Sequence, residues 1–203
     1  MIPIPSAFAN VRQPRRALAR LACALLAACA GVASANSTAP APAAGATSYT
    51  VTLKQLGRNY PMSLRGVEST DSVSFDVRAG SIVTGARLNL QYTYSPALLA
   101  ELSQINVLVN DEVAASLALP KDKAGQLQQQ MVQIPAHLIT EFNRLSLQFI
   151  GHYTMSCEDP QHSSLWAKIS NASELGIDVS PLVLPDDLAI MPLPFFDRRD
   201  ARA

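Results

Sequence analysis

The chain has 203 residues, 48% of them hydrophobic, and its 16 Lys and Arg are balanced by 16 Asp and Glu. This composition excludes a collagen-like repeat and a highly charged disordered chain, and the length fits one domain of ordinary size. The first 35 residues hold four arginines and no acidic residue, so the remaining 168 residues carry a net charge of −4. A mildly acidic body disfavours nucleic-acid binding, which needs many Lys and Arg contacts to phosphates.

Residues 1–35 are typical of a secretory signal peptide. They combine arginines, an apolar run over 21–30 and a small-residue pattern that ends at Ala35. Because a membrane-spanning helix needs roughly 20 apolar residues, about twice this run, cleavage after Ala35 is predicted rather than a permanent anchor. A lipoprotein signal is a second interpretation, since residues 26–29 match a lipobox and Cys29 would then be acylated. Either signal exports the body of the chain.

The next segment, 36–48, is rich in Ala, Pro, Ser and Thr and has no large apolar side chain, which predicts a disordered linker. From residue 49 onward, apolar and polar side chains alternate with the period of two that is typical of half-buried strands. Strands are predicted at 72–77, 88–94, 105–109, 113–119, 127–134, 145–153, 165–169 and 175–179. The residues between the third and fourth of these, Asn110 and Asp111, favour a hairpin because both types tolerate left-handed backbone.

Regular short strands separated by Gly, Pro, Asn and Ser predict an all-β fold, a jelly-roll β-sandwich over 49–180. Two short helical insertions are expected within it. One covers 97–102, with Ser95 as N-cap and Pro96 as first helical residue, and the other covers 136–142. Since strands and helices do not alternate, a parallel dinucleotide-binding sheet is not expected.

The final segment, 181–203, breaks the strand pattern. Four prolines between 181 and 194 exclude a central strand, yet large apolar side chains such as Phe195 and Phe196 accompany them. An apolar, proline-rich terminus normally packs against other protein. We expect it to be an exit segment toward a further domain that this chain lacks.

Residues 151–166 hold two of the three histidines, the only tryptophan and the only cysteine outside the signal peptide. A metal site made of His152, Cys157 and His162 is disfavoured, because the spacing matches no familiar zinc motif and supplies three ligands only. A nucleophilic Cys–His pair is disfavoured too, because no local motif supports it. Such pairs are recognised by their geometry, which a sequence does not show.

The same segment contains two adjacent carboxylates, Glu158 and Asp159. A glycosidase pair is disfavoured, because catalytic carboxylates lie about 5–9.5 Å apart across a cleft and chain neighbours seldom flank a sugar. The favoured interpretation is an ordered loop between two strands, in which Cys157 is buried and the carboxylates accept hydrogen bonds from backbone amides.

Trp166 follows this loop. If its neighbours Leu165 and Ala167 face the core, strand alternation places the indole on the opposite face. An exposed indole can stack on a pyranose ring, so we predict that Trp166 is a sugar platform, assisted by Tyr153 or His152. The alternative is that the loop or a following domain covers Trp166.

Arg198 and Arg202 have the RxxxR spacing with which some proteins grip the phosphates of cyclic dinucleotides. The second half of that pattern, D/N-x-S-x-x-G, is missing, because Asp178-Val-Ser180 continues with Pro181. We interpret the arginine pair as a chance match.

The runs GHYTMSCEDPQHSSLW (151–166) and LPDDLAIMPLPFFD (184–197) resemble the regulatory B subunit of bacterial cellulose synthase. The resemblance covers nearly all of 49–200. It implies a periplasmic, carbohydrate-binding-module-like jelly roll that leads into a flavodoxin-like domain. Members of the family end in a membrane helix that docks on the catalytic subunit, whereas this chain stops at Ala203.

The resemblance also implies a function. We expect a non-catalytic accessory subunit, in the periplasm and associated with the inner membrane, that helps guide nascent β-1,4-glucan. Its implied partners are the catalytic subunit of cellulose synthase, the nascent cellulose and other copies of the chain. It implies no cofactor; cyclic di-GMP enters only through the family's traditional label. The alternative is a protein–protein interaction module of the secretion complex, and a hydrolase that uses Cys157 or Glu158 is least favoured.

Overall fold

The computed structural model describes residues 46–182 and 188–191. Within these residues the chain forms ten strands and no α-helix. The predicted signal peptide with Ala35 and Cys29, most of the linker, and the Arg198–Arg202 pair lie outside the described residues. The strands are β1 (Thr47–Thr52), β2 (Met62–Arg65), β3 (Glu68–Asp76), β4 (Ser81–Tyr94), β5 (Gln104–Val109), β6 (Glu112–Ala118), β7 (Gln128–Ile134), β8 (Phe142–Ile150), β9 (Trp166–Ile169) and β10 (Glu174–Pro181).

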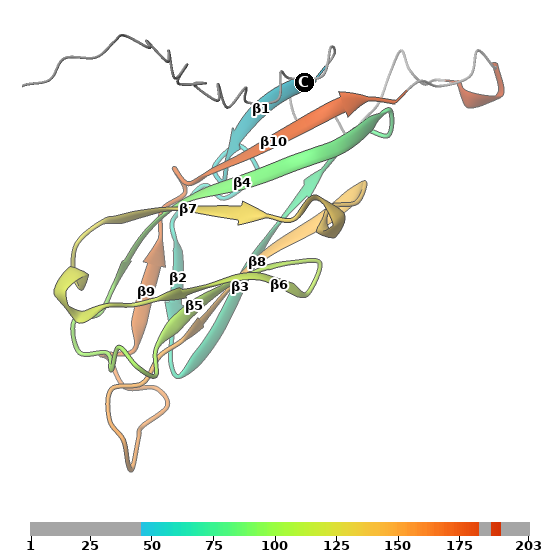
Figure 1. The fold of residues 1–203 in the computed structure, drawn as a ribbon. Helices are drawn as coiled ribbons and strands as arrows, with labels where there is room; N and C mark the ends of the chain where they lie inside the picture. The colour runs from blue at the N-terminus through green and yellow to red at the C-terminus, as the bar shows by residue number, and fades with distance from the viewer. Residues whose placement is uncertain (1–45, 183–187, 192–203) are drawn as a thin grey trace, which may run out of the picture. The chain divides into compact units, whose positions relative to one another are not determined.

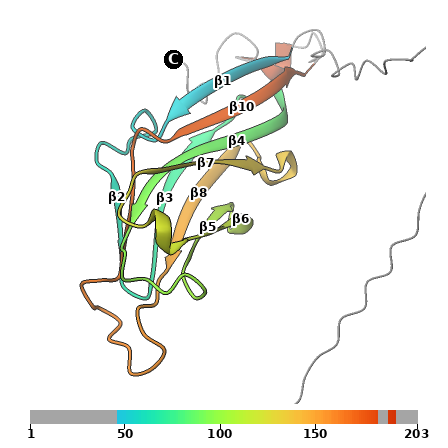
Figure 2. The ribbon, with the colours of Figure 1, turned by 60° about the vertical axis from the view of Figure 1, so that its left-hand side comes forward.

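The strands form two antiparallel sheets (Figures 1 and 2). The first sheet has the order β1-β10-β4-β9-β2, and β7 pairs with β4 as well. Residues 86–89 of β4 pair with both β10 and β7, so these two strands lie on opposite edges of β4. The second sheet has the order β3-β8-β5-β6. The prediction of an all-β sandwich is confirmed.

One core lies between the sheets, and the alternation of side chains builds it. Along β4, Ala86, Leu88, Leu90, Tyr92 and Tyr94 are buried, while the residues between them face outward. The second sheet contributes Leu145, Leu147 and Phe149 from β8, all of them fully buried. These side chains belong to a single hydrophobic cluster, so each sheet buries its apolar face against the other.

The predicted hairpin at Asn110 and Asp111 is confirmed. It joins β5 to β6, and both residues have positive φ, 52° and 70°. The Asn110 amide secures the turn to β8, because its oxygen accepts a hydrogen bond from the Arg144 N–H at 2.9 Å. Its nitrogen donates to the Leu138 carbonyl at 2.8 Å.

Both predicted helical insertions are wrong in extent. Residues 97–102 form turns, in which the Ser95 hydroxyl does accept a hydrogen bond from the Ala97 N–H at 3.2 Å. Of 136–142, only Ala136–Leu138 forms a single 3-10 turn, and Phe142 already belongs to β8. Segments this short do not offset the cost of nucleating a helix, and pairing with neighbouring strands takes over. Among the described residues, no helix is long and apolar enough to cross a bilayer.

The strand predicted at 145–153 lies three residues earlier, at Phe142–Ile150. Its start pairs with β3, where Asp76 lies opposite Phe142. Its end is set at Gly151, whose N–H donates to the Val67 carbonyl at 2.9 Å. The chain leaves the sheet there and enters the segment that sequence analysis singled out.

Candidate functional site

Residues 151–165 form a long loop that links β8 of the second sheet to β9 of the first. Figures 1 and 2 both show this loop projecting beyond the ends of the strands, at the lower tip of each view. Six of the predicted site residues lie in it: His152, Tyr153, Cys157, Glu158, Asp159 and His162.

Two neighbouring turns hold the loop in place. In the turn between β2 and β3, the Gly66 N–H donates to the Leu165 carbonyl at 3.1 Å and the Val67 N–H donates to the Pro160 carbonyl at 3.2 Å. From the other side, the Leu99 N–H donates to the His152 carbonyl at 2.7 Å. Three separate points of the loop are thus bound to backbone elsewhere, so it is ordered rather than free.

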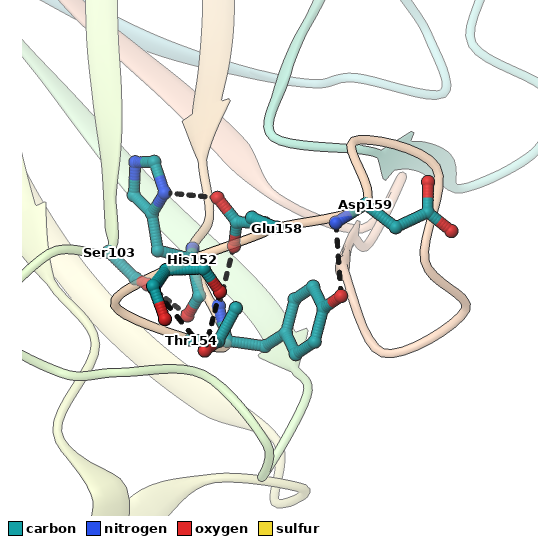
Figure 3. Close-up of polar contacts among 7 residues, drawn as sticks. Ser103, His152, Thr154, Glu158 and Asp159 are labelled. Atoms are coloured by element: carbon teal, nitrogen blue, oxygen red, sulfur yellow. Dashed lines mark hydrogen bonds and ion pairs between the residues drawn. The ribbon is translucent and has the colours of Figure 1, made fainter.

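A histidine–carboxylate contact organises the first half of the loop (Figure 3). The His152 Nδ1 lies 2.7 Å from the Glu158 Oε2. The second oxygen, Oε1, accepts a hydrogen bond from the Tyr153 N–H at 2.9 Å. Hydrogen bonds from the Tyr153 amide and the His152 side chain lower the pKa of Glu158, because they stabilise its ionised form.

Buried Ser103 supports His152 from the turn before β5. The Ser103 hydroxyl accepts a hydrogen bond from the His152 N–H at 3.0 Å, and it lies 3.3 Å from the His152 carbonyl oxygen, to which it donates. Sequence analysis missed Ser103, because it lies 49 residues from its partner and a lone serine before a strand gives no distinguishing pattern.

Aromatic stacking organises the second half of the loop. The Tyr153 and His162 rings are stacked with centroids 4.3 Å apart and an interplanar angle of 16°. The Tyr153 hydroxyl accepts a hydrogen bond from the Asp159 N–H at 3.1 Å. The Asp159 carboxylate accepts one from the Gln161 N–H at 3.0 Å. The expectation that both loop carboxylates accept backbone hydrogen bonds is confirmed.

The prediction that Cys157 is buried is wrong. The residue is exposed and forms no disulfide within the described residues, with a φ of +53°, and the nearby Met155 is 81% exposed. The reason is local: at this point of the loop the Glu158 carboxylate and the Tyr153 hydroxyl make the contacts within the loop, and Cys157 takes the left-handed backbone conformation between them. Among the described residues no group of three or more His, Cys, Asp and Glu side chains is placed to hold a metal ion.

Trp166 begins β9 and lies apart from this network. Its neighbours Leu165 and Ala167 are 1% and 0% exposed, so the indole faces outward as predicted, and it is half-buried. Trp166 lies opposite Arg65 of β2, and its carbonyl accepts a hydrogen bond from the Ser95 N–H at 3.1 Å. Within the described part of the chain, no hydrogen bond or ring contact joins Trp166 to Tyr153 or His152.

The comparisons with known proteins agree with this fold. Residues 46–181 match the family model described as "Cellulose synthase BcsB, first CBM domain". A cyclic di-GMP-binding protein of Pseudomonas fluorescens is 66% identical over 93% of this chain and 25% of its own length. The protein of the same name from Xanthomonas axonopodis is 47% identical over 81% of this chain and 21% of its own. A putative cellulose synthase 2 of Komagataeibacter xylinus is 31% identical over 73% and 10%.

The chain spans about a quarter or less of the length of these relatives. The match covers every strand of the sandwich, from β1 to the end of β10. The chain belongs to the cellulose synthase BcsB family, and its β-sandwich is the first carbohydrate-binding-module domain of that family.

Proposed function

We propose that this chain is a non-catalytic accessory part of a cellulose synthase complex and that its sandwich domain holds nascent β-1,4-glucan. It acts in the periplasm at the inner membrane, after export directed by residues 1–35. The catalytic subunit and the emerging cellulose are its partners. Binding is weak, since a polymer in transit has to be released as readily as it is held.

The outward, half-buried position of Trp166 on a domain of this family is the observation that carries the proposal. A flat indole at the surface offers the apolar face that a pyranose ring stacks on, and polar neighbours can then bind the hydroxyls. Tyr153 and His152 are occupied by their contacts within the loop. Their role in this proposal is therefore to shape the loop beside β9, with Trp166 as the primary sugar contact.

The relatives are named cyclic di-GMP-binding proteins. We propose glucan rather than cyclic di-GMP as the ligand of this domain, since phosphates would need uncommitted arginines. Three of the five arginines among the described residues are paired with carboxylates: Arg58 with Asp71, Arg87 with Asp178, and Arg144 with Asp111. A dianionic ligand would have to compete with these carboxylates for the three arginines.

A hydrolase that uses Glu158 is disfavoured by the state of that carboxyl. A general acid has to be protonated near neutral pH, which requires a raised pKa. The pKa of Glu158 is lowered instead, and both of its oxygens are engaged by the backbone and by His152. Non-catalytic binding suits this environment better.

Titration of the full chain with cellohexaose, followed by the fluorescence of its single tryptophan, tests the proposal. We expect a saturable change in emission, and a cellohexaose affinity that falls at least fivefold in Trp166→Ala when measured by calorimetry. Maltohexaose and cyclic di-GMP are the control ligands. A folded protein that does not respond to cellohexaose contradicts the proposal.

Exposed Met155 in the loop favours a second candidate, a module that contacts other subunits or other copies of the chain. The discriminating result is co-purification with the catalytic subunit. If Met155→Asp or Trp166→Ala abolishes co-purification while cellohexaose binding stays unchanged, the interaction module is the correct function.

A further inference from the structure

The outer face of the first sheet carries a cluster of uncharged amide side chains across β4 and β7. These two strands lie side by side in Figure 1. In their register Gln91 lies opposite Gln129 and Asn89 lies opposite Met131, and Gln133, the next outward residue of β7, lies opposite Arg87. The amide face consists of Asn89, Gln91, Gln129, Met131 and Gln133.

Strand alternation fixes the outward direction of the amide face. On β4, Leu88 and Leu90 are fully buried, so Asn89 and Gln91 point the other way. On β7, Val132 and Ile134 are buried and the amide-face residues are exposed, with Met131 54% exposed. The cluster is therefore a surface of the folded domain rather than part of its core.

The amide face keeps unused hydrogen-bonding capacity. Each amide offers two N–H donors and a carbonyl with two lone pairs. Gln129 Nε2 donates to Asn89 Oδ1 at 2.9 Å, which leaves the Asn89 NH₂ and the Gln129 oxygen available. Among the described residues the side chains of Gln91 and Gln133 make no hydrogen bond at all.

The outer face of the second sheet provides a comparison, because its amide side chains hydrogen-bond to one another. Gln104 donates to Asn106 at 3.1 Å, Asn106 donates to Gln148 at 2.9 Å, and Ser116 also donates to Asn106, at 2.7 Å. The chain of bonds ends where Gln148 donates to the charged Glu68 at 2.7 Å. Amides on that face hold the sheet together, whereas the amide face is open to a ligand.

The amide face lies on the same side of the sheet as Trp166. The Ser95 N–H bonds to the Trp166 carbonyl, so the indole is level with the end of β4, six residues beyond Asn89. At the rise of a strand this is about 20 Å. Charged side chains border the amide face: Arg87, opposite Gln133, pairs with Asp178 at 2.8 Å, and Lys168 lies opposite Thr93 on the stretch toward Trp166.

We propose that the amide face is a glucan-binding track and that a linear, uncharged β-glucan lies on it along β4 toward Trp166. The amides hydrogen-bond sugar hydroxyls, and Met131 contacts the C–H face of a ring. Amides that supply both donors and acceptors complement a linear chain of sugar hydroxyls. This inference rests on the proposed function and assigns the residues that carry it.

Side-chain NH₂ resonances of the ¹⁵N-labelled full chain test the proposal during titration with cellohexaose. We expect the signals of Asn89, Gln91, Gln129 and Gln133 to shift and those of Gln104 and Gln148 to stay. The triple variant Gln91→Ala, Gln129→Ala, Gln133→Ala should bind cellohexaose at least tenfold more weakly, because several ligand hydrogen bonds are lost together. The double variant Gln104→Ala, Gln148→Ala is the matched control and should bind as the parent does.

The outcomes separate this inference from the proposed function. If the triple variant binds like the parent while Trp166→Ala does not, glucan binding stands and the track is wrong. If the parent does not bind cellohexaose, both are wrong. If the triple variant has the sugar affinity of the parent but a lower sedimentation coefficient, the amide face joins two copies of the chain. That result also overturns the proposal.

Discussion

At the scale of single residues, Glu158 is a largely buried carboxylate that is held by hydrogen bonds within the loop. Its side chain is 17% exposed and accepts hydrogen bonds through both oxygens. Those bonds stabilise the carboxylate, and they lower the pKa of Glu158 in the folded state. Its contribution to stability is therefore fully present above the ordinary glutamate pKa of about 4.3 and is lost as pH falls through the lower pKa of the folded state.

Glu158→Gln should remove this pH-dependent contribution while keeping an oxygen that can accept from the Tyr153 N–H. We expect the variant to melt at a lower temperature than the parent near pH 7, and the two melting curves to approach each other below about pH 4. Thermal denaturation at a series of pH values measures this. Asp159→Asn, which alters a more exposed neighbour, is the control. A constant difference in melting temperature across the series would contradict the role given to Glu158.

At the scale of elements, the loop depends on the turn between β2 and β3. Gly66 has a φ of +91°, and a Cβ there would lie 3.0 Å from the Pro160 carbonyl oxygen. Gly57 has a similar φ of +96° but open space around it. Alanine at either position strains the backbone, and alanine at Gly66 also pushes against the loop.

We therefore expect Gly57→Ala to cost about 1 kcal/mol and Gly66→Ala about 2–3 kcal/mol of unfolding free energy. Urea denaturation measures both, and cleavage by glutamyl endopeptidase after Glu158 reports on the loop directly. Cleavage should accelerate in Gly66→Ala and stay unchanged in Gly57→Ala. Equal stability and equal cleavage in the two variants would show that the turn does not hold the loop.

Much of this element structure could be predicted from the sequence, because alternation along β4 and β5 and the Asn110–Asp111 turn are local signals. The predictions of two helical insertions were wrong. An N-cap and a proline at Ser95 and Pro96 favour the start of a helix, but the segment that follows is too short to sustain one. The site was predicted in part: the outward direction of Trp166 follows from alternation. The exposure of Cys157 and the part played by Ser103 depend on contacts between distant segments, which no local pattern contains.

At the scale of the whole domain, the two sheets share a single core. Leu147 of β8 is fully buried in the cluster to which Leu88 and Leu90 of β4 also belong. Among the described strands the two sheets share no strand-to-strand pairing, and this core couples them. A cavity in the second sheet should consequently destabilise the first sheet by the same amount.

Leu147→Ala tests this coupling, because the only tryptophan, Trp166, lies in the first sheet and reports on it alone. We expect a loss of about 2–5 kcal/mol, with the midpoint of Trp166 fluorescence and that of far-ultraviolet circular dichroism shifting together in urea. Leu127→Ala, at a residue that is 67% exposed, is the matched control and should change stability by less than about 0.5 kcal/mol. If circular dichroism shifts while the Trp166 transition stays in place, the sheets unfold separately. In that case the first sheet, which carries the proposed glucan track, would be stable without the second sheet.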